Sequence, residues 1–209
     1  MRKLLSYYGP IFTTLSKIGD FAILNLLVLV SCLPVVTIGA SITAGHLTAL
    51  KLVREEASVW QDFRKSFVCN LKQGTFLWLG FLFLWTGCVL GMPFFSSFMS
   101  AVSVILGAVL LLSLLVGLWV FPVLSRFEDR AVNILRNATV LSFRYLLRTI
   151  AMLLSFLALP LIIMRVGLGV LPLWLLFGLS VPLWLCAKMY DPIFTELEER
   201  VLNKKMGAE

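Results

Sequence analysis

The sequence predicts an all-α fold: a polytopic bundle of transmembrane helices, with amphipathic helices at the cytoplasmic membrane surface. Composition is the first observation, because 60% of the 209 residues are hydrophobic and 14% are charged, against about 25% charged in soluble domains. The second is a mean hydropathy of +0.97. The third is the length of the uncharged runs, which cover residues 21–50, 73–125 and, except for Arg165, 149–187. Since a span needs about 20 mainly apolar residues, each of the last two runs holds two spans.

The charged residues predict the orientation. All acidic residues, and all basic residues except Arg165, lie in four segments, which are residues 1–20, 51–73, 125–148 and 188–209. Short loops rich in Lys and Arg stay in the cytoplasm, so we expect the last three segments, with the C-terminus, on that side. The chain is then a multi-pass plasma-membrane protein. Its four expected spans are residues 74–95, 99–124, 147–164 and 168–188.

The N-terminal apolar run, residues 21–50, allows two arrangements. As one helix it would be about 45 Å long, more than the roughly 30 Å hydrocarbon core of a bilayer. Pro34 removes a backbone donor in its middle, and Thr37 and Gly39 follow where the chain can turn. The run is either one broken span with an external N-terminus, or a hairpin with arms of about 13 residues that are too short to cross fully. The basic residues near the N-terminus favour the hairpin.

The chain is expected to form a single integral membrane domain, residues 1–209, in four parts. Residues 1–56 hold the broken N-terminal element. Residues 57–124 and 125–190 each hold an interfacial helix followed by a two-helix hairpin, and residues 191–209 form a cytoplasmic helix. Small residues four positions apart, as in Gly87-x-x-x-Gly91, let helices approach closely. They predict packing within this bundle or within an oligomer.

Three motifs predict where the cytoplasmic helices begin. Two fit the capping box, in which a serine and the side chain three residues later satisfy free amide donors. The third places an N-cap aspartate before a proline at the first helical position. The motifs are Ser58-x-x-Gln61, Ser125-x-x-Glu128 and Asp191-Pro192.

Basic residues of the cytoplasmic segments are candidate contacts for the lipid bilayer or for a partner protein. An amphipathic helix at the headgroup level turns its apolar face to the lipid and its arginines to anionic headgroups. A docking surface for a cytoplasmic partner has the same pattern, so both interpretations stay open. The candidates are Arg64, Lys65, Lys72, Arg126, Arg130, Arg144 and Arg148.

No residue pattern indicates catalysis, a cofactor or a metal site. The interiors of the four expected spans contain no Asp, Glu, Lys or His, although ionisable groups at membrane depth usually mark proton relays or substrate sites. His46 is the only histidine, and Cys32, Cys69, Cys88 and Cys186 are scattered singly, so no zinc or disulfide spacing exists. The basic residues lie beside spans and not on a soluble domain, which argues against nucleic-acid binding. We expect a protein that is not an enzyme.

Residues 32–40, Cys-Leu-Pro-Val-Val-Thr-Ile-Gly-Ala, resemble the YesL-like family of bacterial integral membrane proteins, whose biochemical function is unknown. Residues 25–27 before this stretch, and residues 51–55 and 70–73 after it, agree with the same family. Its members often have proline where this chain has Ala40. The resemblance implies a Gram-positive type plasma membrane and an association with carbohydrate uptake beside sugar ABC importers. It brings no catalytic residues with it.

The expected function is that of a non-catalytic accessory or scaffold protein beside an ABC importer. The chain is not a standard permease subunit, because its best match to the ATPase-docking loop, residues 130–134, lacks the Glu and the glycine of that motif. The alternative is a small-solute carrier whose binding site is the broken segment 34–44, since discontinuous helices line transporter sites. The candidate motif for that site is Pro34, Thr37, Gly39, Thr43 and His46.

Overall fold

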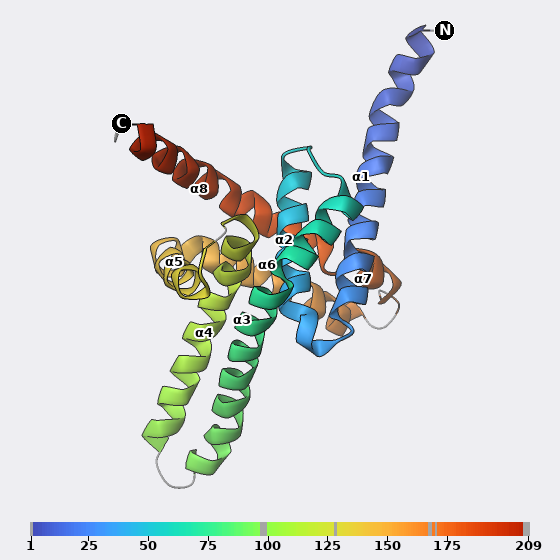
Figure 1. Ribbon diagram of the computed structural model, residues 1–209. Coiled ribbons are helices and arrows are strands. Elements are labelled where there is room, and N and C mark those ends of the chain that lie inside the picture. The colour runs from blue at the N-terminus through green and yellow to red at the C-terminus, as the bar shows by residue number, and fades with distance from the viewer. Residues whose placement is uncertain (1, 97–99, 128, 167–168, 170, 207–209) are drawn as a thin grey trace.

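The computed structural model describes residues 2–96, 100–127, 129–166, 169 and 171–206, and every regular element among them is helical (Figure 1). This confirms the all-α fold class. The elements are α1 (Arg2–Cys32), the short 3-10 helix η1 (Val35–Thr37), α2 (Ile38–Val53), α3 (Val59–Ser96), α4 (Ser100–Arg126), α5 (Ala131–Arg144), α6 (Leu146–Val166), α7 (Leu171–Phe177) and α8 (Ser180–Met206).

Four helical segments are long and apolar enough to cross a membrane, and they belong to α1, α2, α3 and α4. Their bounds are Leu15–Cys32, Val35–Val53, Val59–Pro93 and Val102–Arg126. A further candidate is the pair Ala131–Arg144 and Leu146–Ala158, which is bent by 98°. The described residues of the spans expected at 74–95, 99–124 and 147–164 lie within α3, α4 and α6.

The single helix expected over residues 168–188 is wrong, because α7 ends at Phe177 and a new helix begins at Ser180. The separate helix expected after Asp191 is also absent, since α8 continues to Met206 with Pro192 in its interior. Packing overrides the proline signal here: Tyr190, Ile193 and Phe194 are all buried against the core, so this part of α8 is held by its neighbours.

The N-terminal run forms a hairpin. The Lys17 ammonium lies 2.6 Å from the Glu55 carboxylate, which places the start of the apolar part of α1 beside the end of α2. If the run formed one broken span, Lys17 and Glu55 would lie at its opposite ends, on opposite sides of the membrane. The arms are longer than the 13 residues expected, because their apolar segments have 18 and 19 residues.

The hairpin of α1 and α2 meets α3 at two glycines. A Cβ atom on Gly39 would lie 2.2 Å from the Gly74 carbonyl oxygen, and one on Gly74 would lie 3.0 Å from the Ala40 nitrogen. The two backbones are therefore in direct contact, as small residues permit. Beyond Gly74, α3 continues to Ser96, a length of about 33 Å at 1.5 Å per residue. In Figure 1 this part of α3 and its partner α4 extend well past the turn between α1 and α2.

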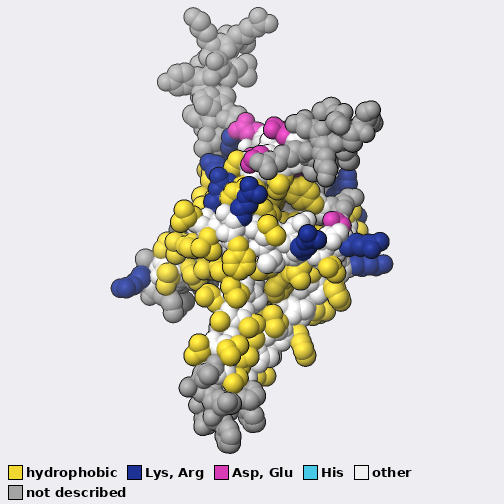
Figure 2. All heavy atoms as spheres, turned by 90° about the vertical axis from the view of Figure 1, so that its left-hand side faces the viewer, with side chains coloured by type: hydrophobic (Ala, Val, Ile, Leu, Met, Phe, Trp, Pro, Cys, Tyr) yellow, Lys and Arg dark blue, Asp and Glu magenta, His cyan; other side chains and the backbone are white. Residues whose placement is uncertain are grey.

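Helix α2 occupies the centre of the molecule. It packs against α1, α3, α4 and α8, and ten of its sixteen residues are buried. The charged side chains are not part of this central packing. On the face shown in Figure 2 most of them lie in the upper and middle parts, with one basic side chain at the left edge, whereas hydrophobic side chains cover the α3–α4 hairpin below. The molecule therefore has a charged end, formed around the ends of α2, α4 and α8 and the start of α3.

Candidate functional site

The break between α1 and α2 is closed by side chains. The Thr37 hydroxyl can donate to the Ser31 and Pro34 carbonyl oxygens, at 2.7 and 2.9 Å. The Trp78 indole N–H donates to the Val35 carbonyl at 2.9 Å. Non-helical backbone in an apolar environment needs such partners, and Pro34 and Thr37 thus stand where the sequence predicted the turn.

A second break, between α7 and α8, was not predicted. Its backbone is satisfied by Asn25 of α1, which is fully buried. The Asn25 amide nitrogen donates to the Leu175 carbonyl at 2.6 Å, and its oxygen accepts from the Leu179 and Ser180 N–H groups at 2.7 and 3.1 Å. One side chain therefore caps the end of one helix and the start of the next.

The polar residues proposed for a solute site bond within the protein. The Thr43 hydroxyl donates to the Gly39 carbonyl at 2.7 Å, and the Ser41 hydroxyl to the Thr37 carbonyl at 3.0 Å. His46 is 3% exposed. The Tyr190 hydroxyl donates to the His46 carbonyl at 3.0 Å and lies 3.4 Å from its Nδ1 atom. The polar atoms of these side chains face helix backbone and Tyr190.

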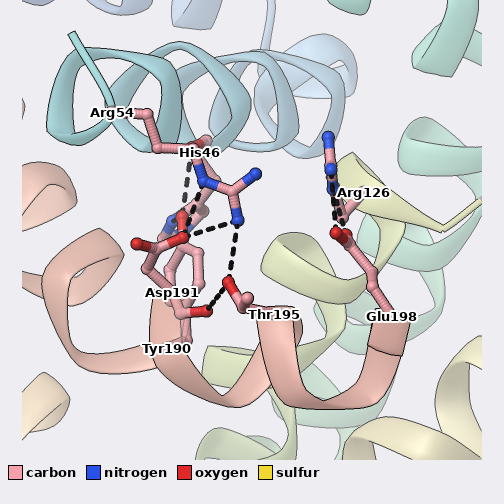
Figure 3. A network of polar contacts seen from close by, with 7 residues as sticks. All are labelled: His46, Arg54, Arg126, Tyr190, Asp191, Thr195 and Glu198. Carbon is pink, nitrogen blue, oxygen red and sulfur yellow. Dashed lines mark hydrogen bonds and ion pairs between the residues drawn. The ribbon is translucent and has the colours of Figure 1, made fainter. Parts of the chain in front are cut away.

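At the charged end, ion pairs join α8 to two other helices (Figure 3). Arg54, after α2, contacts Asp191 at 2.6 Å and donates to the Thr195 hydroxyl at 3.3 Å. Arg126, at the end of α4, donates two hydrogen bonds, from Nε and Nη2, to the Glu198 carboxylate. Asp191, Thr195 and Glu198 are four and three residues apart, so they share one face of α8. Asp191 therefore binds an arginine and does not cap a helix.

The Arg126–Glu198 pair predicts a pH dependence of stability. The hydrogen bond from Arg126 holds the pKa of the Glu198 carboxyl below its ordinary value of 4.5. A depressed carboxyl pKa stabilises the fold above the unfolded-state value, and the contribution is lost as pH falls through the folded-state value. Glu198→Gln is expected to lower the free energy of unfolding at pH 7 by at most about 1 kcal/mol. The Tm of the detergent-solubilised protein should fall accordingly. The difference from wild type should shrink below pH 4.5.

Glu199→Gln is the matched control, because Glu199 is exposed one position further along α8. It should leave the Tm unchanged at both pH values. A Glu198→Gln deficit that stays constant between pH 7 and the acid range would contradict the ion-pair explanation.

Of the other two predicted helix starts, one is confirmed with a different capping side chain and one is wrong. Helix α3 begins after Ser58 as expected, but the side chain that returns to the Ser58 N–H is Asp62, at 2.8 Å, and not Gln61. The start expected after Ser125 is wrong, since α4 extends through it and α5 begins at Ala131. The Ser125 hydroxyl donates to the Pro122 carbonyl instead, and Glu128 lies outside the described residues.

A cavity of about 710 Å³, lined by both charged and apolar residues, opens at the charged end, between α2, α3, the end of α4 and the segment that leads to α5. Gln73 donates to the Asp129 carbonyl at 2.8 Å, which fixes that segment to α3. Lys51 and Asp62 form an ion pair in the wall. The lining also includes Leu47, Lys65, Ser66, Cys69, Asn70, Leu124, Arg126, Phe127 and Arg130. The volume of this cavity suits a small molecule.

Comparisons with known proteins give one result. Residues 21–94 match the family model described as "Protein of unknown function, DUF624". YesL-like proteins belong to DUF624, so the match agrees with the resemblance at the level of that family. No curated protein and no solved structure matches the chain.

The DUF624 match covers the apolar part of α1, η1, α2 and most of α3. It therefore includes the glycine contact of Gly39 with Gly74, the Trp78 bond to the turn and the Lys51–Asp62 pair. Of the cavity lining, residues 47–73 lie inside the DUF624 match and residues 124–130 lie outside it.

The basic residues predicted as outward contacts divide into three groups. Lys65, Arg126 and Arg130 line the cavity, and Arg64 and Lys72 are exposed on α3. The Arg148 guanidinium donates to the Met189 carbonyl at 2.8 Å and so belongs to the internal packing. Arg144, like Arg148, lies over the Tyr145 ring, at 5.7 Å from its centroid.

Sequence reasoning missed Asn25 and Tyr190 as structural partners. A lone asparagine in an apolar run was the available signal for Asn25, since a buried amide must find hydrogen-bond partners. Tyr190 gave no signal of its own, because its partner His46 lies 144 residues earlier.

Proposed function

We propose that this chain is a non-catalytic accessory or scaffold protein of the bacterial plasma membrane, with its charged end and C-terminus in the cytoplasm. It assists carbohydrate uptake by contacting an ABC importer. The carbohydrate context comes from the resemblance of residues 25–73 to the YesL-like family. The membrane location is supported by the four apolar helical segments long enough to cross a bilayer.

The observation that carries the proposal is the outward face of α5. Ile134, Ala138 and Leu141 of this helix pack into the core. On its other face, Val132 and Phe143 are 76% and 57% exposed. Arg136 and Val140 lie between them at helical spacing, also exposed. A helix with a buried face and an outward apolar and basic face offers a surface for lipid headgroups or for a partner subunit.

The orientation predicts a labelling pattern. In a chain whose native cysteines have been replaced, a single cysteine at Asn137 or Lys204 should not react with an impermeant maleimide added outside intact cells. A single cysteine at Ser97, which lies outside the described residues, should react. Labelling of Asn137→Cys from outside would overturn the orientation.

The function predicts a cellular phenotype. Deleting the gene should lower sugar uptake through a co-expressed importer, and the importer should co-purify with the chain in mild detergent. The double variant Val140→Ser and Phe143→Ser should reproduce the uptake defect while the protein still accumulates. Leu147→Ser with Leu154→Ser, on the exposed face of α6, is the control and should leave uptake unchanged. Normal uptake in the α5 variant would contradict the proposal.

A small-solute carrier is the second candidate, and the two helix breaks favour it. Discontinuous helices line many transporter sites, and here η1 and the α7–α8 junction are both breaks held by side chains. The purified protein in liposomes distinguishes the two functions. Solute flux that disappears when Thr43 and His46 are replaced by alanine would establish the carrier, whereas the accessory function predicts no flux.

A further inference from the structure

We propose that the cavity at the charged end binds a phosphate-bearing ligand, either the headgroup of an anionic phospholipid or a small phosphate compound from the cytoplasm. The inference goes beyond the proposed function, because it needs neither an importer nor carbohydrate uptake. It concerns the cavity of about 710 Å³ between α2, α3 and α4, a volume typical of small-molecule sites.

Positive charge dominates the cavity wall. Four basic side chains line it against two acids; the six are Lys51, Lys65, Arg126, Arg130, Asp62 and Asp129. They come from α2, α3, the end of α4 and the segment before α5, so charges far apart in the sequence converge on one space. Arginine and lysine in such a cluster are the side chains that bind phosphate oxygens.

Two of these cations are available to a ligand. Lys51 pairs with Asp62 and Arg126 with Glu198. By contrast, no described acid lies within ion-pair distance of the Lys65 or Arg130 side chain. A cation outside any described ion pair gains most from an anion that enters the cavity, since the ligand replaces only water.

The acid nearest to Arg130 is already engaged. The Asp129 carboxylate accepts from the Asn133 amide at 2.8 Å and from the Arg130 N–H at 2.6 Å. These bonds, with that of Asn133 first, and the charge of Arg130 hold the pKa of Asp129 below its ordinary value. The carboxylate bonds to the start of α5 and forms no ion pair with the Arg130 guanidinium, so this guanidinium can bond to another anion.

Neutral groups complete a site suited to an amphiphile. Ser66, Asn70 and Gln73 follow one face of α3 into the cavity, at four- and three-residue spacing. Leu124 and Phe127 add apolar surface to the same space. A phosphate group can bond to the cations while a glycerol or acyl portion lies against these two side chains.

The cavity also lies at the expected depth for a headgroup. Lys51 and Arg126 stand at the ends of the apolar segments Val35–Val53 and Val102–Arg126, where chains leave the hydrocarbon for the interface. A lipid can enter from the membrane plane and a soluble compound from the water side. The phosphate group is common to both.

Cys69 provides a direct test, because it lines the cavity and is exposed, whereas Cys88 and Cys186 are buried. With the other three cysteines replaced by alanine, the full-length protein in uncharged detergent is treated with N-ethylmaleimide. The alkylation rate of Cys69 is measured with short-chain phosphatidylglycerol, glycerol 3-phosphate, inorganic phosphate or short-chain diacylglycerol. We expect a phosphate-bearing probe to slow the reaction and diacylglycerol to leave it unchanged. Protection by the lipid alone identifies a headgroup site, and protection by all three phosphates identifies a site for soluble phosphate compounds.

Two charge-matched double variants decide whether the cavity is responsible. Lys65→Gln with Arg130→Gln should raise the half-protecting probe concentration about tenfold. Lys72→Gln with Arg165→Gln, two exposed residues outside the cavity lining, should leave it unchanged. Rates with and without probe are compared within each variant, and an unaltered Tm shows that each one is folded. Absence of protection in the wild-type cavity, or an equal loss in both double variants, would overturn the inference. Neither outcome bears on importer association, so the two proposals fail separately.

Discussion

Replacing Gly39 by alanine is expected to destabilise the protein by about 3 kcal/mol. The added methyl group would lie 2.2 Å from the Gly74 carbonyl oxygen and 2.6 Å from the Trp78 Cβ atom. Both contacts are with backbone or with a Cβ atom, which cannot rotate away, so α2 and α3 must separate. A large fall in Tm in detergent, with loss of monodisperse elution, is the expected measurement.

Gly80→Ala is the control for this change. Nothing lies within 4 Å of a Cβ atom at Gly80 on α3, and alanine is about 1 kcal/mol better than glycine in a helix. The same substitution should therefore leave the Tm unchanged or raise it. If Gly39→Ala and Gly80→Ala behaved alike, α2 and α3 would not cross at these glycines.

Replacing Asn25 by alanine has an expected cost of roughly 4 kcal/mol, because three backbone groups lose their partner at once and each buried unsatisfied group costs about 1–3 kcal/mol. The groups are the Leu175 carbonyl and the Leu179 and Ser180 N–H groups. The junction of α7 and α8 should open locally before the whole protein unfolds. Hydrogen exchange at the amides of residues 179–180 should therefore accelerate more than exchange in α3.

Asn137→Ala is the matched control, since Asn137 is exposed on α5. It should change neither the Tm nor the exchange at residues 179–180. Unaltered exchange there in Asn25→Ala would mean that the junction is held by packing and not by this amide.

The local parts of the fold could be read from the sequence, and the distant contacts could not. Pro34, Thr37 and Gly39 predict the first turn because proline, a hydroxyl and a glycine act on their own neighbourhood. The second break has two local signals, Gly178 and, in the first turn of α8, Pro182, but they lie in an apolar run that also fits one continuous span. The geometry of this break depends on Asn25, whose side-chain oxygen accepts a hydrogen bond from the Leu179 N–H. Asn25 lies 154 residues earlier in the sequence.

The candidate site shows the same division. Lys65 and Arg130 could be identified singly as interfacial cations, since charge beside apolar runs is a local pattern. That they line one cavity follows from the packing of α2, α3 and the end of α4 around it and from the Gln73 bond to the Asp129 carbonyl. Neither feature has a signature at either position. Asp191 is a further example. The local pattern of aspartate before proline predicts a helix cap, but in the structure the Asp191 carboxylate pairs with Arg54.

The hydrogen bonds of Asn25 to the α7–α8 junction also have a consequence during synthesis of the chain, because the bonded residues are made at different times. Asn25 is translated 150 residues before Leu175, and His46 and Arg54 precede their partners in α8 by 144 and 137 residues. The N-terminal hairpin is therefore made while the groups that complete it do not yet exist. A chain that stops before α8 keeps a polar amide uncovered among apolar helices, which is the kind of defect that membrane proteases and chaperones can recognise. Helix α8 thus completes the hydrogen bonds of Asn25, His46 and Arg54 only after 137 to 155 further residues have been made.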